Sequence, residues 1–270
     1  MRTTFYSYLE GTRPTVVPST PELESWLEPS RSAVLCIDMH RGHIGPEEQV
    51  TCPAPRARER IAAHDDFHAA ARAMGVPVIH VQHWQRHGGI DDRHNRAENH
   101  MANWRILYTL YLPPNPLMDE HSWEGTPWLD LLVEVGDEDF FVRTKKRLSG
   151  FYPTDLEFLL RQMNVLNVVI TGTNTDACCL STAFDAANRD FRVLMPRDVV
   201  AGTSEEAEQA ALLVVSLHLG LVVDGAALLA EWAARRGLPA PLTPHLAPVV
   251  ANPVPSLVEV ADGSPRHAPA

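Results

Sequence analysis

The sequence predicts one large α/β domain built around a parallel sheet. Short apolar runs with the length and β-branched character of buried strands alternate along the chain with longer segments whose apolar residues recur at helical spacing. At 270 residues and 30.0 kDa the chain is long enough for one such domain with a full core. We therefore expect a single α/β domain over residues 32–236, preceded by an arm and followed by a tail.

The clearest unit of this kind lies between Asn164 and Asp198. Asn167 to Ile170 is a short β-branched run and predicts a fully buried strand. A loop with cap-type side chains follows, and apolar residues then recur at helical spacing, so a helix should begin near Asp176 to Cys178. Arg192 to Met195 predicts the next strand, which completes a β-loop-α-β unit of the kind that builds parallel sheets.

Cys178 stands where this central strand gives way to a helix. Unpaired N–H groups and the positive end of the helix dipole gather at such a terminus. We therefore expect the Cys178 thiol to ionise more readily than a thiol inside a helix, which would suit a cysteine nucleophile.

The beginning of the chain is rich in glycine and proline. Residues 1–31 contain Gly11 and four prolines, and they predict an irregular arm lying over the domain rather than a core element. The aromatic residues Phe5, Tyr6 and Tyr8 would cover a site or, as the simpler alternative, form a surface or subunit contact.

Two strands and a helix follow the arm. Ala33 to Ile37 predicts an apolar strand that stops at Asp38, and ligands collect at the carboxyl ends of such strands in open parallel sheets. A helix is expected from about Pro55 to Met74, then a strand over Val78 to Val81 that leads into a candidate site loop over residues 82–89.

The pattern weakens between about residues 88 and 136, a long aromatic and proline-rich excursion that predicts a lid or binding loop. Phe140 to Arg143 returns as a strand and runs into Lys145, and Thr154 opens the next helix. After Asp198 we expect a helix near 204–217, a strand near 221–224 and a helix near 226–235. Residues 237–270, rich in proline and alanine, predict an extended tail.

Composition narrows the function classes. The net charge is −11 and the basic residues are dispersed, which argues against a nucleic-acid or membrane-surface partner and favours a small-molecule substrate. No apolar run approaches the roughly 18 residues of a membrane span, and residues 1–10 lack the apolar segment of a signal peptide, so we expect a cytoplasmic protein. The four cysteines form neither a disulfide framework nor a CxxC metal site.

Three chemically useful side chains follow predicted strands: Asp38, Lys145 and Cys178. A thiolate needs a cation to stabilise it and a carboxylate to move protons, and this trio contains one of each.

At these residues the chain resembles the isochorismatase-like cysteine hydrolases. LCIDMHRG, with Asp38, is similar to the family's DMQ segment. TKKRLSGFYPTDLEFLL, with Lys145, is similar to its K-x-R-[YL]-S-x-F-x-x-T-x-L segment, and ITGTNTDACCLSTAFDAANRDFRV, with Cys178, to its G-x-x-T-x-x-C-V-x-x-T-x-x-x-A segment. The segments occur in the family's order, and the resemblance covers about residues 33–224.

The resemblance implies a three-layer α/β/α fold with a Rossmann-like, mostly parallel six-stranded sheet, in a protein that forms a homo-oligomer, a dimer or tetramer. It implies Cys178 as nucleophile, Lys145 as stabilising cation and Asp38 as proton carrier. It also implies an oxyanion hole from the backbone N–H groups of Asn174 and Cys178, next to a non-proline cis peptide near Thr173-Asn174.

The chain departs from the family pattern at two places. His40 stands where Gln is usual, and Cys179 stands where Val is usual. Between the two thiols we choose Cys178, which falls at the family position. Cys179, one residue further along a helix, should point about 100° away, toward packing.

Nicotinamidases of this family carry a metal near the loop that contains His83, His87, Asp91, Asp92 and His94 here. Their typical Asp-x-His sequence is replaced by Gln82-His83-Trp84, so we expect a polar loop, no metal and no cofactor. No GxGxxG follows a predicted strand, which argues against a dinucleotide site. Candidate substrate contacts are His40, His83, Trp84, Arg86, Trp104, Arg105, Tyr108, Phe151 and Thr173.

The leading hypothesis is a cysteine amidohydrolase that cleaves a small linear amide or a ureido or carbamoyl compound and releases ammonia, in the manner of N-carbamoylsarcosine, ureidoacrylate or biuret hydrolases. Three alternatives remain: a metal-dependent nicotinamidase-type amidase, an isochorismatase-type vinyl-ether hydrolase that does not need the cysteine, and a non-catalytic binding or scaffold protein. The sequence does not identify the substrate.

Overall fold

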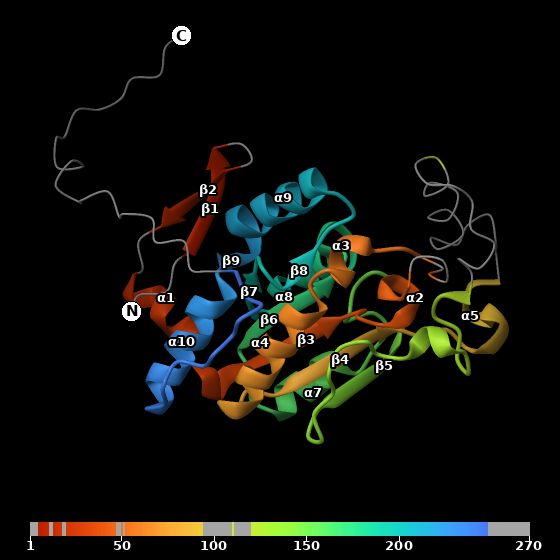
Figure 1. Ribbon diagram of the computed structural model, residues 1–270, viewed down its shortest axis with the longest axis horizontal. Coiled ribbons are helices and arrows are strands. Elements are labelled where there is room, and N and C mark those ends of the chain that lie inside the picture. The colour runs from red at the N-terminus through yellow and green to blue at the C-terminus, as the bar shows by residue number, and fades with distance from the viewer. Residues whose placement is uncertain are drawn as a thin grey trace, which may run out of the picture.

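A parallel sheet with helices on both faces forms the centre of the molecule (Figure 1). The computed structural model describes residues 5–10, 13–17, 20–46, 50, 52–93, 110 and 120–247. Six parallel strands lie in the spatial order β9-β7-β6-β3-β4-β5. They are β3 (Ser32–Ile37), β4 (Val78–His83), β5 (Phe140–Lys145), β6 (Asn167–Thr173), β7 (Arg192–Pro196) and β9 (Gly220–Val223). The mostly parallel sheet and the α/β/α layers are thereby confirmed.

The central strands are apolar because helices cover both of their faces. Every residue of β3, β4 and β6 is buried. Along β3, Val34 and Cys36 belong to the core on one face, whereas Leu35 and Ile37 belong to the core on the other, as the two-residue period of a strand requires. Strand β5 lies at the edge of the sheet, and most of its residues are exposed.

Each face of the sheet has its own set of helices. Helices α4 (Ile61–Ala73) and α10 (Gly225–Arg236) pack Phe67 and Trp232 into the first core. Helices α7 (Leu156–Gln162), α8 (Leu180–Ala187) and α9 (Glu205–Val214) contribute to the second core. The shorter described elements are α1 (Pro21–Glu24), α2 (Arg41–Ile44), α3 (Pro55–Arg58), α5 (Ile90–Arg93) and β8 (Val200–Ala201). Short 3₁₀ segments cover Ser25–Leu27, Pro29–Arg31, His87–Gly89 and Pro127–Leu129, and π turns cover Thr175–Cys179 and Val215–Leu219.

The expectation of an irregular N-terminal arm was wrong for the residues that the structure describes. Strands β1 (Phe5–Glu10) and β2 (Arg13–Val17) pair antiparallel, and β1 extends the sheet by pairing with β9. Pro14 misled the sequence argument, because β2 is an edge strand and an edge strand tolerates a residue without an N–H donor. Phe5, Tyr6 and Tyr8 are buried at this edge of the sheet rather than over a site.

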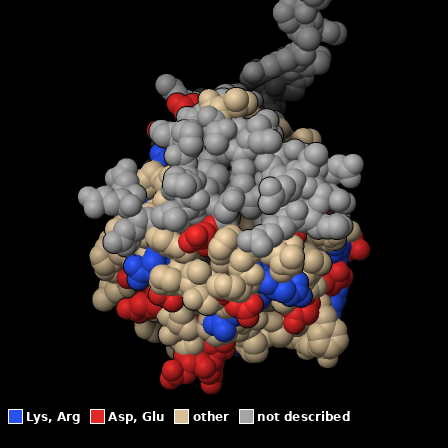
Figure 2. All heavy atoms as spheres, turned by 90° about the vertical axis from the view of Figure 1, so that its right-hand side faces the viewer, with Lys and Arg blue, Asp and Glu red and all other residues tan. Residues whose placement is uncertain are grey.

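Other boundaries differ in smaller ways. The helix expected over Pro55 to Met74 is divided into α3 and α4, with Glu59 and Arg60 between them. Residues 94–109 and 111–119 of the 88–136 excursion, and the tail beyond residue 247, lie outside the described residues. Within the described part, no helix is long and apolar enough to cross a membrane. On the side of the molecule at the right of Figure 1, lysine and arginine side chains are interspersed with acidic ones (Figure 2).

The β1-β2 hairpin is joined to the domain by a buried polar contact that can be tested. Tyr6 Oη donates to Asp224 Oδ2 at 2.6 Å, and Arg197 Nε donates to Asp224 Oδ1 at 2.7 Å. We expect Tyr6→Phe to lower the free energy of unfolding by about 1 to 3 kcal/mol, because it removes a donor from a buried carboxylate. Urea unfolding measures the change, and Tyr152→Phe, at an exposed tyrosine, is the control. Equal stability of the two variants would contradict a role for this contact.

Three buried histidines between α4 and β4 make stability depend on pH. His64, His68 and His80 are fully buried, with ring centroids 5.7 Å (His64–His68) and 6.1 Å (His68–His80) apart. Burial lowers the pKa of all three, and it lowers that of His64 to about 4. Below pH 6.5, histidines of the unfolded chain bind protons, whereas these three rings stay neutral in the folded protein.

As the pH falls below 6.5, protons bind the unfolded chain first, so stability falls until the folded pKa is reached. For His64 this loss amounts to about 3 kcal/mol by pH 4. We expect His64→Gln, which cannot titrate, to flatten the loss of unfolding free energy between pH 7 and pH 4, measured by urea titration. His218→Gln, at an exposed histidine, is the matched control. An unchanged slope in His64→Gln would refute the assignment.

Candidate active site

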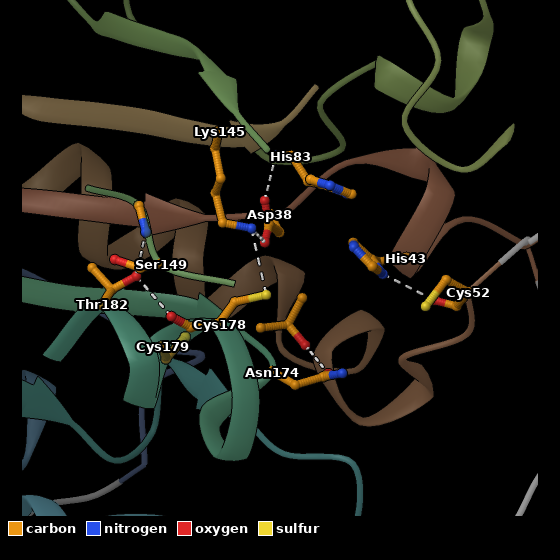
Figure 3. A network of polar contacts seen from close by, with 12 residues as sticks. Asp38, His43, Cys52, His83, Lys145, Ser149, Asn174, Cys178, Cys179 and Thr182 are labelled. Atoms are coloured by element: carbon orange, nitrogen blue, oxygen red, sulfur yellow. Dashed lines mark hydrogen bonds and ion pairs between the residues drawn. The ribbon is translucent and has the colours of Figure 1, made fainter. Parts of the chain in front are cut away.

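The carboxyl ends of neighbouring strands bring three side chains together. Asp38 follows β3, Lys145 is the last residue of β5, and Cys178 lies in the π turn that follows β6. Because β6, β3, β4 and β5 are neighbours in the sheet, these ends lie side by side. The Lys145 Nζ atom lies 2.5 Å from Asp38 Oδ2 and 3.5 Å from Cys178 Sγ (Figure 3). A carboxylate, an ammonium and a thiol are therefore in direct contact.

Backbone geometry holds the Asp38 carboxylate in place. Asp38 has a φ of +53°, and its N–H donates to the carbonyl of Val81 at 2.9 Å. Its Oδ1 atom accepts the backbone N–H of His83 at 2.6 Å, while Oδ2 accepts from Lys145. Both oxygens are thus engaged, so the carboxylate cannot rotate without losing a hydrogen bond.

Close packing of β3 and β6 leads up to the site. Gly172 has a φ of +107°, and a Cβ added there would lie 2.1 Å from the carbonyl oxygen of Ile37. Only glycine allows this approach, which places the residues that follow β6 beside Asp38. The next peptide bond but one, Thr173-Asn174, is cis, as the resemblance implied.

The turn around Cys178 is held from both sides. The carbonyl of Asn174 accepts the N–H groups of Ala177 and Cys179, each at 3.0 Å. Thr182 Oγ1 donates to the Cys178 carbonyl at 2.7 Å. Cys178 is half-buried and its sulfur points toward Lys145, whereas Cys179 is fully buried among apolar side chains, so the expected orientation of the second thiol is confirmed (Figure 3).

Asp38 and Lys145 form a buried ion pair. Burial by itself would raise the pKa of the Asp38 carboxyl, but the adjacent Lys145 ammonium holds that pKa below its usual range. Burial would likewise lower the pKa of Lys145, and the Asp38 carboxylate keeps it above its usual value. Both groups are therefore charged near neutral pH.

That Cys178 ionises more readily than a thiol inside a helix stays a prediction, but its pKa lies above that of a free thiol. Burial raises the pKa of the Cys178 thiol to about 12, which outweighs the lowering by Lys145, and the Asp38 carboxylate adds to the rise. A Cys178 thiolate beside the Asp38 carboxylate would have to share the Lys145 ammonium with it. The effect of burial on the pKa of the thiol is therefore larger than the opposite effect of the helix terminus. The resting site holds a neutral thiol.

A cluster of four histidines, named here the histidine cluster, packs beside these groups. Its members are His40, His43, His83 and His121. Ring centroids lie 4.8 Å apart for His40 and His43, 5.1 Å for His43 and His121, and 5.0 Å for His83 and His121. Gly42 permits the packing, since a Cβ there would lie 2.0 Å from the carbonyl oxygen of His121.

Sequence reasoning missed His43 and His121. The three-residue spacing of His40 and His43 after a strand end was a legible signal for the first. His121 lies in the long excursion, where no periodicity points to a partner. A cavity of about 20 Å³, with room for about one water molecule, lies between the cluster and the thiol. It is lined by Asp38, His43, His83, His121, Lys145, Arg147, Leu148 and Cys178.

Only some of the other candidate substrate contacts that the structure describes lie at the cavity. His83 lines the cavity, and His40 is buried behind it in the histidine cluster. Thr173 is buried at the end of β6, where its hydroxyl contacts the Asn174 side chain. Trp104, Arg105 and Tyr108 lie outside the described residues.

Three of the candidate contacts lie away from the cavity. Trp84 lines a separate surface hollow, and Arg86 is an exposed partner of Asp91. Phe151 belongs to the apolar core, with Phe191 at 5.9 Å between ring centroids. Spacing along the sequence could not separate these residues from the true cavity wall.

No metal-ligating set was found among the described residues: no group of three or more histidine, cysteine, aspartate or glutamate side chains has a suitable arrangement. In the predicted polar loop, His87 lies near the carbonyl of Glu124 and Asp91 pairs with Lys146. Within the histidine cluster, His83 and His121 are hydrogen bonded to each other at 3.0 Å. The described side chains therefore do not fit a metal centre as they stand.

Comparison with known proteins identifies the family of the chain. The sequence model of the isochorismatase domain family matches residues 32–227. A Bacillus subtilis protein described as the uncharacterized isochorismatase family protein PncA is 32% identical over 201 residues, which cover 72% of this chain and 98% of that protein. The ureidoacrylate amidohydrolase RutB of Methylobacterium radiotolerans is 29% identical over 223 residues, covering 78% of this chain and 83% of RutB.

A solved structure shows the same fold. The cysteine hydrolase from Pseudomonas syringae pv. phaseolicola superposes with a TM-score of 0.65 at 23% sequence identity, covering 77% of this chain and 94% of that one. The resemblance noted in the sequence is thereby confirmed. Because the family model matches residues 32–227 and a relative is 32% identical over 72% of this chain, this protein belongs to the isochorismatase family of hydrolases.

Proposed function

We propose that the protein is a cysteine-dependent amidohydrolase that cleaves a small linear amide or a ureido or carbamoyl compound and releases ammonia. The observation that carries this proposal is the contact of the Cys178 thiol with Lys145, which is paired with Asp38, at the edge of a cavity. Similarity to a protein described as a ureidoacrylate amidohydrolase and to one described as a cysteine hydrolase supports it.

In the first half of the reaction, Asp38 takes the proton of the Cys178 thiol while the sulfur attacks the substrate carbonyl carbon. Because the thiol is neutral at rest, its ionisation is coupled to this attack rather than preceding it. The S–C bond forms as the carbonyl π electrons move to oxygen. Asp38 then gives the proton to the leaving nitrogen, the C–N bond breaks, and ammonia departs from a thioester.

In the second half, water attacks the thioester. Asp38 takes a proton from this water and returns it to the sulfur as the S–C bond breaks, which releases the acid and restores the resting thiol. Lys145 remains charged throughout, and its contacts with both Asp38 and Cys178 let it balance whichever of the two is anionic.

The oxyanion hole is proposed on the backbone N–H groups of Asn174 and Cys178. Asn174 immediately precedes the π turn, and Cys178 lies within it. Each such donor typically stabilises the tetrahedral intermediate by about 3 kcal/mol. The association of the protein into a dimer or tetramer, its cytoplasmic location and its independence of a metal stay predictions.

The deciding experiment is a panel of primary amides, carbamoyl amino acids and ureido acids, with ammonia release as the readout. The proposal expects turnover that survives a metal chelator. Turnover that a chelator abolishes and zinc restores would favour the nicotinamidase-type alternative. Turnover of a vinyl ether that is retained in Cys178→Ala would favour the isochorismatase-type alternative, and no turnover of any compound would favour a binding protein.

The two adjacent cysteines provide a matched pair of variants. We expect Cys178→Ala to lower kcat by about 10⁴-fold or more, because the nucleophile is lost, while Cys179→Ala keeps most of its turnover. Mass spectrometry of the acid-quenched protein with substrate should find an acyl adduct on Cys178 and none in Cys178→Ala. Loss of turnover in Cys179→Ala with retention in Cys178→Ala would reverse the assignment of the nucleophile.

The ion pair can be tested by removing one partner and then both. Lys145→Met leaves Asp38 buried without a counter-charge, so we expect a loss of about 3 to 5 kcal/mol in unfolding free energy, together with loss of turnover. The double variant Asp38→Asn with Lys145→Met should regain most of the stability and none of the activity. If the double variant were as unstable as the single one, Lys145 would act through packing rather than charge.

A further inference from the structure

The histidine cluster presents one unused hydrogen-bond acceptor to the cavity, on His43. Its Nδ1 atom lies 3.0 Å from the carbonyl oxygen of Cys52. A carbonyl can only accept, so Nδ1 carries the hydrogen and donates, and Nε2 is left with a lone pair. Burial lowers the pKa of His43, so the ring stays neutral near neutral pH and keeps this lone pair.

This lone pair has no partner in the described part of the structure. The hydrogen bond to Cys52 and the ring contacts with His40 and His121 account for His43 there. His43 lines the same cavity as Cys178 and Lys145, and Figure 3 shows its ring between Cys52 and the catalytic candidates. The acceptor is therefore available to a molecule that enters beside the thiol.

Four other described side chains that line the cavity do not offer it an open neutral hydrogen-bond acceptor. His83 uses both ring nitrogens, with His121 at 3.0 Å and Gln85 at 2.8 Å. Both oxygens of Asp38 are engaged, and the Lys145 and Arg147 side chains can only donate. His40 also lacks a partner on Nε2, but it does not line the cavity. Among the described side chains that line this cavity, His43 Nε2 is thus a neutral acceptor that is still open to an entering N–H group.

We propose that His43 is a substrate-positioning residue whose Nε2 accepts a hydrogen bond from the departing –NH₂ of the substrate, so that the site selects compounds ending in an unsubstituted carbamoyl group, –CO–NH₂. The inference rests on the proposed function. An amide nitrogen that donates one hydrogen to His43 turns its developing lone pair toward the proton carried by Asp38. A methyl group or an ether oxygen in the same place offers no donor, and the lone pair of His43 then stays unpaired.

The test compares two compounds that share an acyl half. N-carbamoylglycine carries the –NH₂ leaving group, and N-(methoxycarbonyl)glycine carries a methoxy group instead; if another primary amide of the panel is the better substrate, the pair is built on its acyl half. His43→Phe keeps a ring of similar shape and removes the acceptor. We expect kcat/KM for the carbamoyl compound to fall about tenfold to a hundredfold and that for the methoxy compound to change little.

Rescue separates hydrogen bonding from packing. The amide oxygen of His43→Gln can occupy the place of Nε2. This variant should recover part of the ratio of kcat/KM for the carbamoyl compound to kcat/KM for the methoxy compound, whereas His43→Leu should behave like His43→Phe. Equal losses for both compounds, or a Gln variant no better than Phe, would overturn the proposal. So would stoichiometric zinc in the purified protein that is lost in His43→Phe, since His43 would then be a ligand.

Failure of the proposed function has a different signature. It appears in the unsubstituted protein as absence of turnover and of a Cys178 adduct across the whole panel, before any His43 variant is compared. Failure of the His43 inference alone appears as an active protein whose preference for –NH₂ over –OCH₃ is the same with histidine or phenylalanine at position 43.

Discussion

The buried ion pair of Asp38 and Lys145 is the constraint on which the rest of the site depends. Removing two ions from water costs several kcal/mol for each, and this cost is offset only when geometry is good and the remaining hydrogen-bonding positions are filled. Here the pair lies at 2.5 Å, and the second carboxylate oxygen receives the His83 N–H. Because β4 lies between β3 and β5, the sheet order itself sets the distance that the long Lys145 side chain spans.

The ion pair of Asp38 and Lys145 determines which protonation states are favourable for the buried groups around it. With the Asp38 carboxylate and the Lys145 ammonium in balance, a further buried charge would be unfavourable. Burial favours the neutral forms of the thiol and the imidazole nearby: it raises the pKa of the Cys178 thiol to about 12 and lowers that of His40 to about 3. The Cys178 thiolate then becomes favourable only when a bound substrate supplies an electrophilic carbon and its own hydrogen bonds. Neutral histidines, unlike charged ones, can accept as well as donate, which gives the cavity a polar wall without added charge.

Ordinary features of an α/β fold hold the ion pair and the thiol in position. Apolar strands covered on both faces hold the strand ends rigidly, and glycine at position 172 lets β6 approach β3 closely enough for the turn with Cys178 to lie next to Asp38. Farther away, the β1-β2 hairpin covers β9 at one edge, while β5 at the other edge supplies Lys145. Irregular segments contribute His121, whose backbone carbonyl packs closely against Gly42.

The sequence by itself determined the α/β class, the order of strands and helices along the chain, and the three chemically useful side chains at or just beyond strand ends. These features were legible because strand length, apolar character and motif spacing are local properties. Tertiary structure alone decided the rest. Pairing of β1 to β9 and of β2 to β1 made strands of residues 5–10 and 13–17. Burial raised the pKa of the Cys178 thiol, and packing removed Phe151 from the cavity while adding His43 and His121. Edge pairing, desolvation and side-chain contact all arise between segments distant in sequence, so no local pattern encodes them.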